Sequence, residues 1–283
     1  MIIVLKGADF SANNIGHIEV TQKLSPFTLA AIEASGNTSL RSEQKSALNT
    51  FFDNLGAFDN TGLWTKIKVL MMPMLSLDLA HSMVDYTDNE VKVIPNSTYY
   101  EQVQDGLHGI ATEANFVTNA CQFESNKIVS SSNYSVVLLG TPLSVAVDVG
   151  YMNGNLDTVF TGMRAGTNGR NYFIQNHGTQ ILSTLAQSVI VEKSFGFSSG
   201  ASATDVNLYS DGVAKTDTLS AQPKFAATQD GKLRYSFMKK SNGTMLATDG
   251  TLKVAIIGDS LTPDELKSLC DYVDIFNDVF VVE

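Results

Sequence analysis

The sequence has few cysteines, few prolines, one tryptophan and no long apolar run. Its two cysteines, Cys121 and Cys270, lie far apart and neither belongs to a CxxC pair, so no local motif supports a zinc site or thioredoxin-like chemistry. We expect both to be free thiols in or near a core. The apolar runs are far shorter than the roughly 20 residues of a membrane helix, and residues 1–7 lack the basic flank and long apolar stretch of a signal peptide. These absences predict a soluble product of a reducing cytoplasm, without membrane insertion.

Positive charge is scarce as well. The chain has 19 Lys and Arg against 29 Asp and Glu, a formal net charge of -10, and no basic run longer than the pair Lys239-Lys240. Binding to nucleic-acid phosphates needs clustered cations, so this balance argues against a nucleic-acid partner. A content of 43% hydrophobic and 17% charged residues is typical of a folded protein. The 283 residues suffice for one large all-β domain with an N-terminal attachment, or for two small domains.

The first 22 residues hold too little apolar material for a core of their own. A short β-prone stretch, residues 2–5, precedes small and amide residues that favour turns. We expect residues 1–22 to form an N-terminal docking arm that orders on binding, by strand addition to the sheet edge of a partner. The alternative is that the arm pairs with its own sandwich. The apolar anchors of the arm would be Ile2, Val4, Leu5 and Phe10.

Residues 23–75 show helical patterns. Pro26 suits the first turn of a helix over residues 26–33, and a second helix is expected over residues 42–55, where apolar residues recur at spacings of three and four. A third helical segment is predicted over residues 62–72, because Leu63, Ile67, Leu70 and Met71 have helical spacing around Trp64. We therefore expect a small helical module over residues 23–75.

Beyond about residue 76 the hydrophobic period changes from 3.6 to 2. Strand-like runs recur between Gly, Asn and Asp turns, with no helices alternating between them, which predicts an antiparallel β-sandwich and excludes a parallel α/β fold. The expected strands cover residues 136–139, 145–149, 158–161, 171–174, 189–192, 206–209, 234–238 and 252–257.

Two local patterns are sharper. The alternating run of residues 205–209 enters an Asp211-Gly212 turn, which is a strong hairpin pattern. Near the C-terminus, Thr262 as N-cap and Glu265 three residues later form a capping box, with Pro263 at the first helical position. The helix that follows carries an apolar stripe and should close a domain over residues 76–283, packed onto a sheet or a partner. Its stripe consists of Leu266, Leu269, Val273, Phe276 and Phe280.

The hairpin of residues 209–212, with residues 256–266 some forty positions later, resembles the closing half of concanavalin/laminin-G-like jelly rolls. Residues 62–68, preceded by the helix pair, are similar to an arrangement in uncharacterised phage virion proteins. Residues 5–18 resemble the start of virion proteins from phages of gut Bacteroidetes, including the crAss-like group.

This resemblance implies a mainly β protein, an antiparallel β-sandwich of the concanavalin/laminin-G-like type with an N-terminal extended arm, a small helical module and a C-terminal helix. It further implies a structural protein of a tailed-phage virion, made in the bacterial host cytoplasm, as a fibre-like tail or head appendage. Its partners would be other virion structural proteins and copies of itself, with a trimer as the expected homo-oligomer. The chain lacks the clustered acidic loop of calcium-binding laminin-G-like proteins, so neither a metal nor another cofactor is expected, and Asp211 and Asp230 are interpreted as turn residues.

One pattern suggests catalysis. Residues 196–200 match G-x-S-x-G, but a nucleophile elbow needs a helix directly after Ser198, whereas residues 201–205 are typical of a loop leading into a strand. We therefore interpret the pattern as a loop and expect no catalytic residue. All four histidines precede Ser198, against the chain order of α/β-hydrolases, and none has paired-ligand spacing: His17, His81, His108 and His177.

The alternative function is a carbohydrate-binding, lectin-like receptor-binding protein or a polysaccharide-degrading enzyme. Glycosidases need two carboxylates about 5 to 10 Å apart, and Glu124 and Glu192 stand alone in the sequence, so we expect no enzyme. Aromatic side chains could stack on the sugars of a host surface glycan, although packing in the core or between subunits is the competing interpretation. The candidates for glycan contact are Tyr99, Tyr100, Tyr134, Tyr151 and Tyr172.

Overall fold

A computed structural model describes the chain from residue 23 to residue 280 with several gaps. The described residues are 23–92, 100–103, 106–109, 122–125, 127, 133–140, 144–150, 159–166, 169–176, 179–187, 193–200, 206–210, 212–217, 233–237 and 251–280. The predicted arm, residues 1–22, lies outside this part of the chain.

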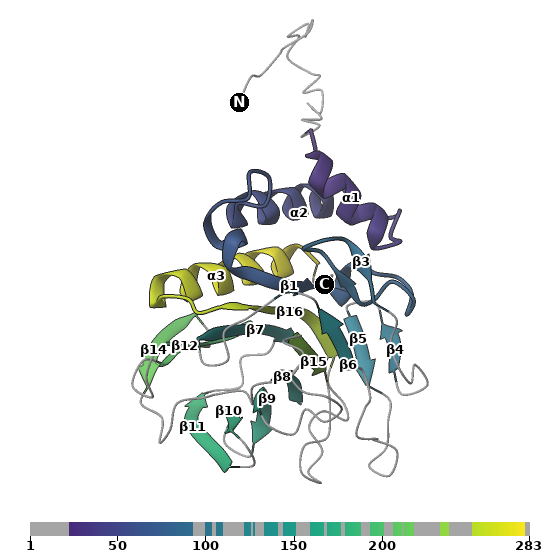
Figure 1. Ribbon diagram of the computed structural model, residues 1–283. Coiled ribbons are helices and arrows are strands. Elements are labelled where there is room, and N and C mark those ends of the chain that lie inside the picture. The colour runs from purple at the N-terminus through teal and green to yellow at the C-terminus, as the bar shows by residue number, and fades with distance from the viewer. Residues whose placement is uncertain are drawn as a thin grey trace, which may run out of the picture.

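Two antiparallel β-sheets and a layer of helices make up the described fold. Figure 1 shows the larger sheet between the helical layer and the smaller sheet. The larger sheet has ten strands, with the order β14-β13-β12-β7-β16-β1-β2-β3, and β5 joins β4 to β16. Its strands are β1 (Ile67–Met71), β2 (Val84–Asp85), β3 (Glu90–Val91), β4 (Tyr100–Val103), β5 (Gly106–Gly109), β7 (Tyr134–Gly140), β12 (Phe195–Ser199), β13 (Val206–Ser210), β14 (Val213–Asp217) and β16 (Thr251–Asp259).

The smaller sheet has the order β11-β10-β9-β8-β15-β6. Its strands are β6 (Gln122–Ser125), β8 (Ser144–Gly150), β9 (Val159–Gly166), β10 (Gly169–Asn176), β11 (Thr179–Gln187) and β15 (Leu233–Phe237). The prediction of a mainly β, antiparallel sandwich is therefore confirmed. Seven of the expected strands overlap observed ones, and the eighth, residues 189–192, lies outside the described residues.

The helices begin where the sequence predicts. In α1 (Pro26–Ala34) the Ser25 Oγ accepts a hydrogen bond from the Thr28 amide at 3.0 Å, and α2 (Ser42–Leu55) ends at Gly56, whose φ of 82° is the left-handed conformation that glycine favours. In α3 (Pro263–Phe280) the Glu265 amide donates to Thr262 Oγ1 at 3.3 Å and the Thr262 amide donates to Glu265 Oε2 at 2.8 Å. The predicted capping box is confirmed.

The helix predicted over residues 62–72 is wrong. Residues Gly62–Lys66 form a single 3-10 helix, η1, and the chain then continues as β1 in the larger sheet, with a second 3-10 helix, η2, over Pro73–Leu75. In β1, Leu70 pairs with Ile256 of β16, and four of the five residues of the strand are buried. Because helices cover one face of β1 and the sandwich interior lies on the other, both faces carry apolar residues, which removed the alternation that marks a strand.

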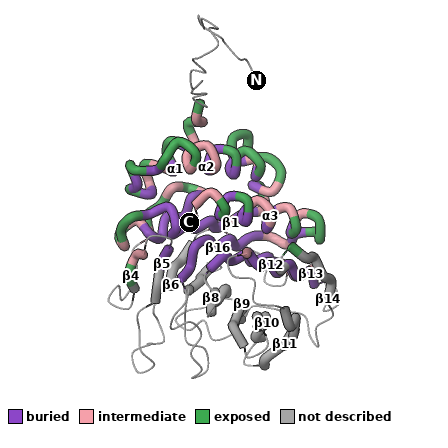
Figure 2. The backbone as a smooth tube through the Cα atoms, turned by 180° about the vertical axis from the view of Figure 1, so that it is seen from behind, coloured by how far each residue is buried: buried purple, intermediate pink, exposed green. Residues whose placement is uncertain are grey.

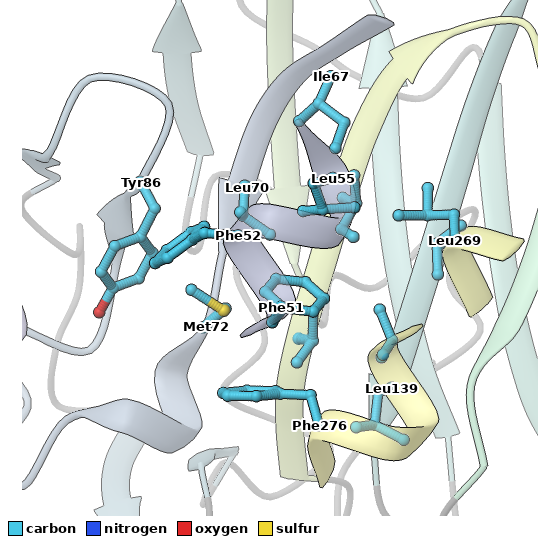
Figure 3. Close-up of a cluster of buried hydrophobic side chains, with 14 of the residues drawn as sticks. Phe51, Phe52, Leu55, Ile67, Leu70, Met72, Tyr86, Leu139, Leu269 and Phe276 are labelled. Atoms are coloured by element: carbon cyan, nitrogen blue, oxygen red, sulfur yellow. The ribbon is translucent and has the colours of Figure 1, made fainter. Parts of the chain in front are cut away.

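The helices and the larger sheet share one hydrophobic cluster. Phe51 of α2 packs on Phe276 of α3 with ring centroids 5.0 Å apart, and Phe52 lies 6.1 Å from Trp64. Figure 3 shows Phe51, Phe52 and Phe276 together with Leu70 and other sheet residues in one cluster. In Figure 2 the strands β1, β12, β13 and β16 next to the helices are coloured mainly as buried, whereas much of α1 and α2 is exposed. Whether residues 23–75 form a domain separate from residues 76–283 stays a prediction.

Candidate interaction surface

Most of the residues predicted as sites lie outside the described side chains. The arm anchors Ile2, Val4, Leu5 and Phe10, and also Tyr99 and Tyr151, fall on residues that the structure does not describe. Tyr100 and Tyr172 are described by their backbones alone, in β4 and β10. These assignments stay predictions.

Tyr134 is described, and its prediction as a glycan contact is wrong. The residue has no exposed surface, and its ring lies 5.5 Å from the ring of Phe197, between centroids. Tyr134 begins β7, in the middle of the larger sheet, so its ring fills the core rather than a surface site. Core packing was the competing interpretation in the sequence, and it holds here.

The G-x-S-x-G segment lies in β12 and not in a loop, so that interpretation is corrected. Ser198 is 1% exposed, its Oγ donates to the Leu261 carbonyl oxygen at 2.9 Å, and the same Oγ accepts from the Leu261 amide at 2.7 Å. Both bonds attach β12 to the residues just before α3. The hydroxyl is buried and forms hydrogen bonds with two backbone groups. Its role is therefore structural, because a nucleophilic serine would have to be exposed.

Buried carboxylates also have structural partners. Asp85 accepts hydrogen bonds from the Leu70 amide at 3.2 Å and from the Thr87 hydroxyl at 2.7 Å, and Lys127 Nζ lies 3.2 Å from its other oxygen. Burial raises the pKa of Asp85, against the lowering effect of Lys127. These contacts hold β1 against the turn after β2.

A second set of polar contacts attaches α3 to the sheet. Asp274 accepts a hydrogen bond from the Ser194 amide at 2.6 Å, and burial raises the pKa of Asp274. Tyr209 of β13 donates its hydroxyl to Asp271, whose other oxygen lies 2.5 Å from Lys267 Nζ. Burial, followed by the hydrogen bond and charge of Asp271, raises the pKa of Tyr209. The phenol therefore stays protonated and acts as a donor.

An apolar groove lies between α2 and α3, and we call it the α2–α3 groove. Its volume is about 580 Å³. The rings of Phe51 and Phe276 belong to its lining, and Ile275 stands beside them with 63% of its surface exposed. The full lining comprises Ser42, Glu43, Ser46, Ala47, Thr50, Phe51, Asn54, Tyr272, Ile275, Phe276 and Val279. The groove therefore combines an exposed isoleucine with a rim of small polar residues, and we take it as the candidate surface for binding another protein segment.

A smaller pocket on the helical layer has a different character. Its volume is about 230 Å³, and its lining combines amides and cations with the ring of Phe280. The polar lining residues are Asn37, Ser39, Arg41, Gln44, Lys253 and Asn277, and the apolar ones beside Phe280 are Leu40, Met74 and Leu77. We call it the amide pocket. Amide groups and an aromatic ring can bind a polar ligand that also has an apolar face, as a sugar ring has.

The described residues include neither a group of metal ligands nor a membrane-spanning helix. No group of three or more His, Cys, Asp and Glu side chains is placed to hold a metal ion in that part of the chain. None of the helices described is long and apolar enough to cross a membrane. Cys270 is a buried free cysteine, as expected from the sequence, and burial raises the pKa of its thiol; Cys121 lies outside the described residues.

No protein-family model and no curated protein matches this sequence. Among solved structures, the chain is similar to domain 4 of AbnA, a GH43 extracellular arabinanase from Geobacillus stearothermophilus in complex with arabinotriose. The identity is 14%, the TM-score is 0.43, and the match covers 72% of this chain and 98% of that one. The CBM40 of the Ruminococcus gnavus IT-sialidase matches at 13% identity and a TM-score of 0.37, over 50% of this chain and 84% of that one.

The Trypanosoma rangeli sialidase in complex with sialic acid matches at 11% identity and a TM-score of 0.47. The match covers 84% of this chain but 39% of the sialidase. With such identities and TM-scores, these similarities assign no activity or ligand to this chain.

Proposed function

We propose that the chain is a non-enzymatic structural subunit that assembles, through its helical layer, with further copies of itself. The observation that carries the proposal is the α2–α3 groove, where Ile275 is 63% exposed beside buried aromatic rings. A water-exposed isoleucine gains about 1.5–3 kcal/mol when it is fully buried, so covering it favours association. The polar groups that could suggest chemistry, Ser198 and Asp274, are occupied by hydrogen bonds that hold the fold together.

The finer part of the proposal concerns where such a subunit acts. The sequence of residues 5–18 and 62–68 resembles phage virion proteins, and we propose a place in a tailed-phage particle as a tail or head appendage. Other virion structural proteins would then be further partners, and a trimer is the expected homo-oligomer. This part rests on the resemblance alone.

Light scattering of the full chain at micromolar concentration tests the proposal. We expect an oligomer, and we expect Ile275→Asp to weaken its association about tenfold or more, because a charge replaces an apolar contact. The matched control is Leu29→Asp on α1, since Leu29 is also an exposed apolar helix residue, at 53%, but does not line the groove. A wild-type chain that stays monomeric would overturn the proposal.

The second candidate function is carbohydrate binding, which the amide pocket favours. Its volume of about 230 Å³ lies below the range of about 300–1,000 Å³ that is usual for small-molecule sites, so it suits a single sugar ring. A glycan array measures binding, and release of reducing sugars from polysaccharides measures hydrolysis. Glycan binding that is lost on Asn277→Ala would establish carbohydrate binding, and hydrolysis would establish an enzyme. A negative result in both assays would favour the structural role.

A further inference from the structure

We propose that the α2–α3 groove of one copy binds residues 1–10 of a neighbouring copy. The inference rests on the proposed assembly function and names the segment that fills the interface. It pairs an apolar groove on the helical layer with the apolar segment of residues 1–10.

The groove itself determines what can fill it. Phe51, Phe276 and Val279 give it apolar walls, and its volume of about 580 Å³ falls in the usual range of ligand-binding clefts. The exposed side chain of Ile275 needs an apolar neighbour. The occupant should therefore offer several adjacent apolar side chains.

Charge narrows the choice further. Glu43 is the one charged side chain among the lining residues described. Direct pairing of groove against groove would place two copies of this acid in one interface, with no cation in either lining to pair with them. An apolar segment with a cation and few acids is the complementary occupant.

Residues 1–10 have this composition. Five apolar residues, Met1 to Leu5, are followed directly by Lys6, and the single acid of the segment is Asp9. Ile2, Val4 and Leu5 would supply the apolar contacts, and Lys6 would lie toward the rim, where Glu43 belongs to the lining. The next apolar residue, Phe10, could extend the contact along the groove.

The position where the described chain begins makes this exchange feasible. The Ser25 amide donates to Asn49 Oδ1 at 2.8 Å, which holds the entry of α1 against α2. Figure 1 shows that α1 begins at the top of the helical layer, on the side away from the sheets. Residues 11–22 can span up to about 40 Å when extended. In the proposed exchange, this reach brings residues 1–10 to the groove of an adjacent copy.

The groove requires a different mode of binding from strand addition. It lies between two helices, whose backbone hydrogen bonds are formed within each helix. The segment would therefore insert side chains into the groove, as peptides that bind between helices do, rather than extend a sheet. In this mode the apolar residues of the segment need no fixed strand register.

Photocrosslinking with isotope labelling tests the inference. The photoreactive residue p-benzoylphenylalanine replaces Ile275 in an unlabelled full chain, which is mixed with an equal amount of nitrogen-15-labelled wild-type chain. After irradiation, mass spectrometry identifies the peptide attached to position 275 and its isotope. The matched control carries the same photoreactive residue at Leu29, outside the groove.

We expect the photoreactive residue at position 275 to be crosslinked to nitrogen-15-labelled peptides from residues 1–10. The photoreactive residue at position 29 should not be crosslinked to these peptides. Peptides from residues 1–10 in unlabelled form only would show that each copy binds its own arm, which overturns the exchange. Any other peptide at position 275 also overturns it. Light scattering on the same samples distinguishes failure of the inference from failure of the proposed function. An oligomer without this crosslink would contradict the inference alone, and a monomer would contradict the proposed function as well.

Substitutions in the segment give an independent readout. Leu5→Asp should weaken association about tenfold or more, since it removes an apolar contact from the groove. The control Ala8→Asp adds the same charge three residues later and should weaken association less. Equal effects of the two substitutions, or none from Leu5→Asp, would contradict the inference.

Discussion

The substitution Ser198→Ala distinguishes a structural serine from a nucleophile. Ser198 is 1% exposed, and its Oγ bonds both the amide and the carbonyl of Leu261, which is itself buried. The alanine variant leaves two buried backbone groups without their partner, and each such loss costs about 1–3 kcal/mol. We therefore expect the free energy of unfolding to fall by about 2–6 kcal/mol.

Urea unfolding followed by tryptophan fluorescence measures this loss. Trp64 is the single tryptophan of the chain and is 8% exposed, so its emission reports on the core between the helices and the sheet. A loss of this size lowers the melting temperature by roughly 4–24 °C for a domain of this length. The control Ser268→Ala, on the half-buried side of α3, should change the free energy of unfolding by no more than about 0.5 kcal/mol.

The reasoning would be refuted if Ser198→Ala kept wild-type stability. If the same variant also abolished an esterase activity of the wild-type chain, the G-x-S-x-G segment would be catalytic and the structural interpretation would be wrong.

Three further substitutions test the attachment of α3. In Gly196→Ala the new Cβ would lie 2.7 Å from Cys270 Sγ, and we expect a loss of about 1–3 kcal/mol by urea unfolding. Phe276→Ala removes a ring that is 2% exposed and should cost about 3–5 kcal/mol in the same assay; a loss under 1 kcal/mol would contradict the described core. Burial raises the pKa of Glu265, but hydrogen bonds from Lys66 and a backbone amide outweigh it and hold the pKa below its usual 4.5. A depressed carboxyl pKa stabilises the fold above the unfolded value, and this contribution is lost as the pH falls through the folded value. Glu265→Gln should therefore cost about 1 kcal/mol at neutral pH, and unfolding curves of variant and wild type should converge below pH 4.5.

Local hydrogen-bond chemistry made parts of the fold predictable. The capping box of Thr262 and Glu265 specifies the start of α3 through two bonds that involve nearby residues only. The Asp211-Gly212 turn likewise predicts the hairpin in which Ser210 pairs with Val213, and Gly212 has the positive φ that such turns need.

Features set by distant neighbours were not predictable. Residues 67–71 are apolar except for Lys68 because β16 lies beside them and helices cover them, and such a run does not distinguish a buried strand from a buried helix. The exposure of Tyr134 likewise depends on its packing with Phe197, more than sixty residues away. The α2–α3 groove joins residues more than two hundred positions apart, so the sequence did not predict it. The one sequence signal was Ile275, an apolar residue of the last helix that lies outside its apolar stripe.

Hydrogen exchange of the wild-type chain at low and at high micromolar concentration tests the central claim most directly. If copies assemble through the helical layer, amides of α2 (Ser42–Leu55) and α3 (Pro263–Phe280) should exchange more slowly at high concentration, while those of β12 (Phe195–Ser199), buried in the sheet, should not change. Exchange rates in α2 and α3 that do not depend on concentration, with the chain monomeric throughout, would contradict the account.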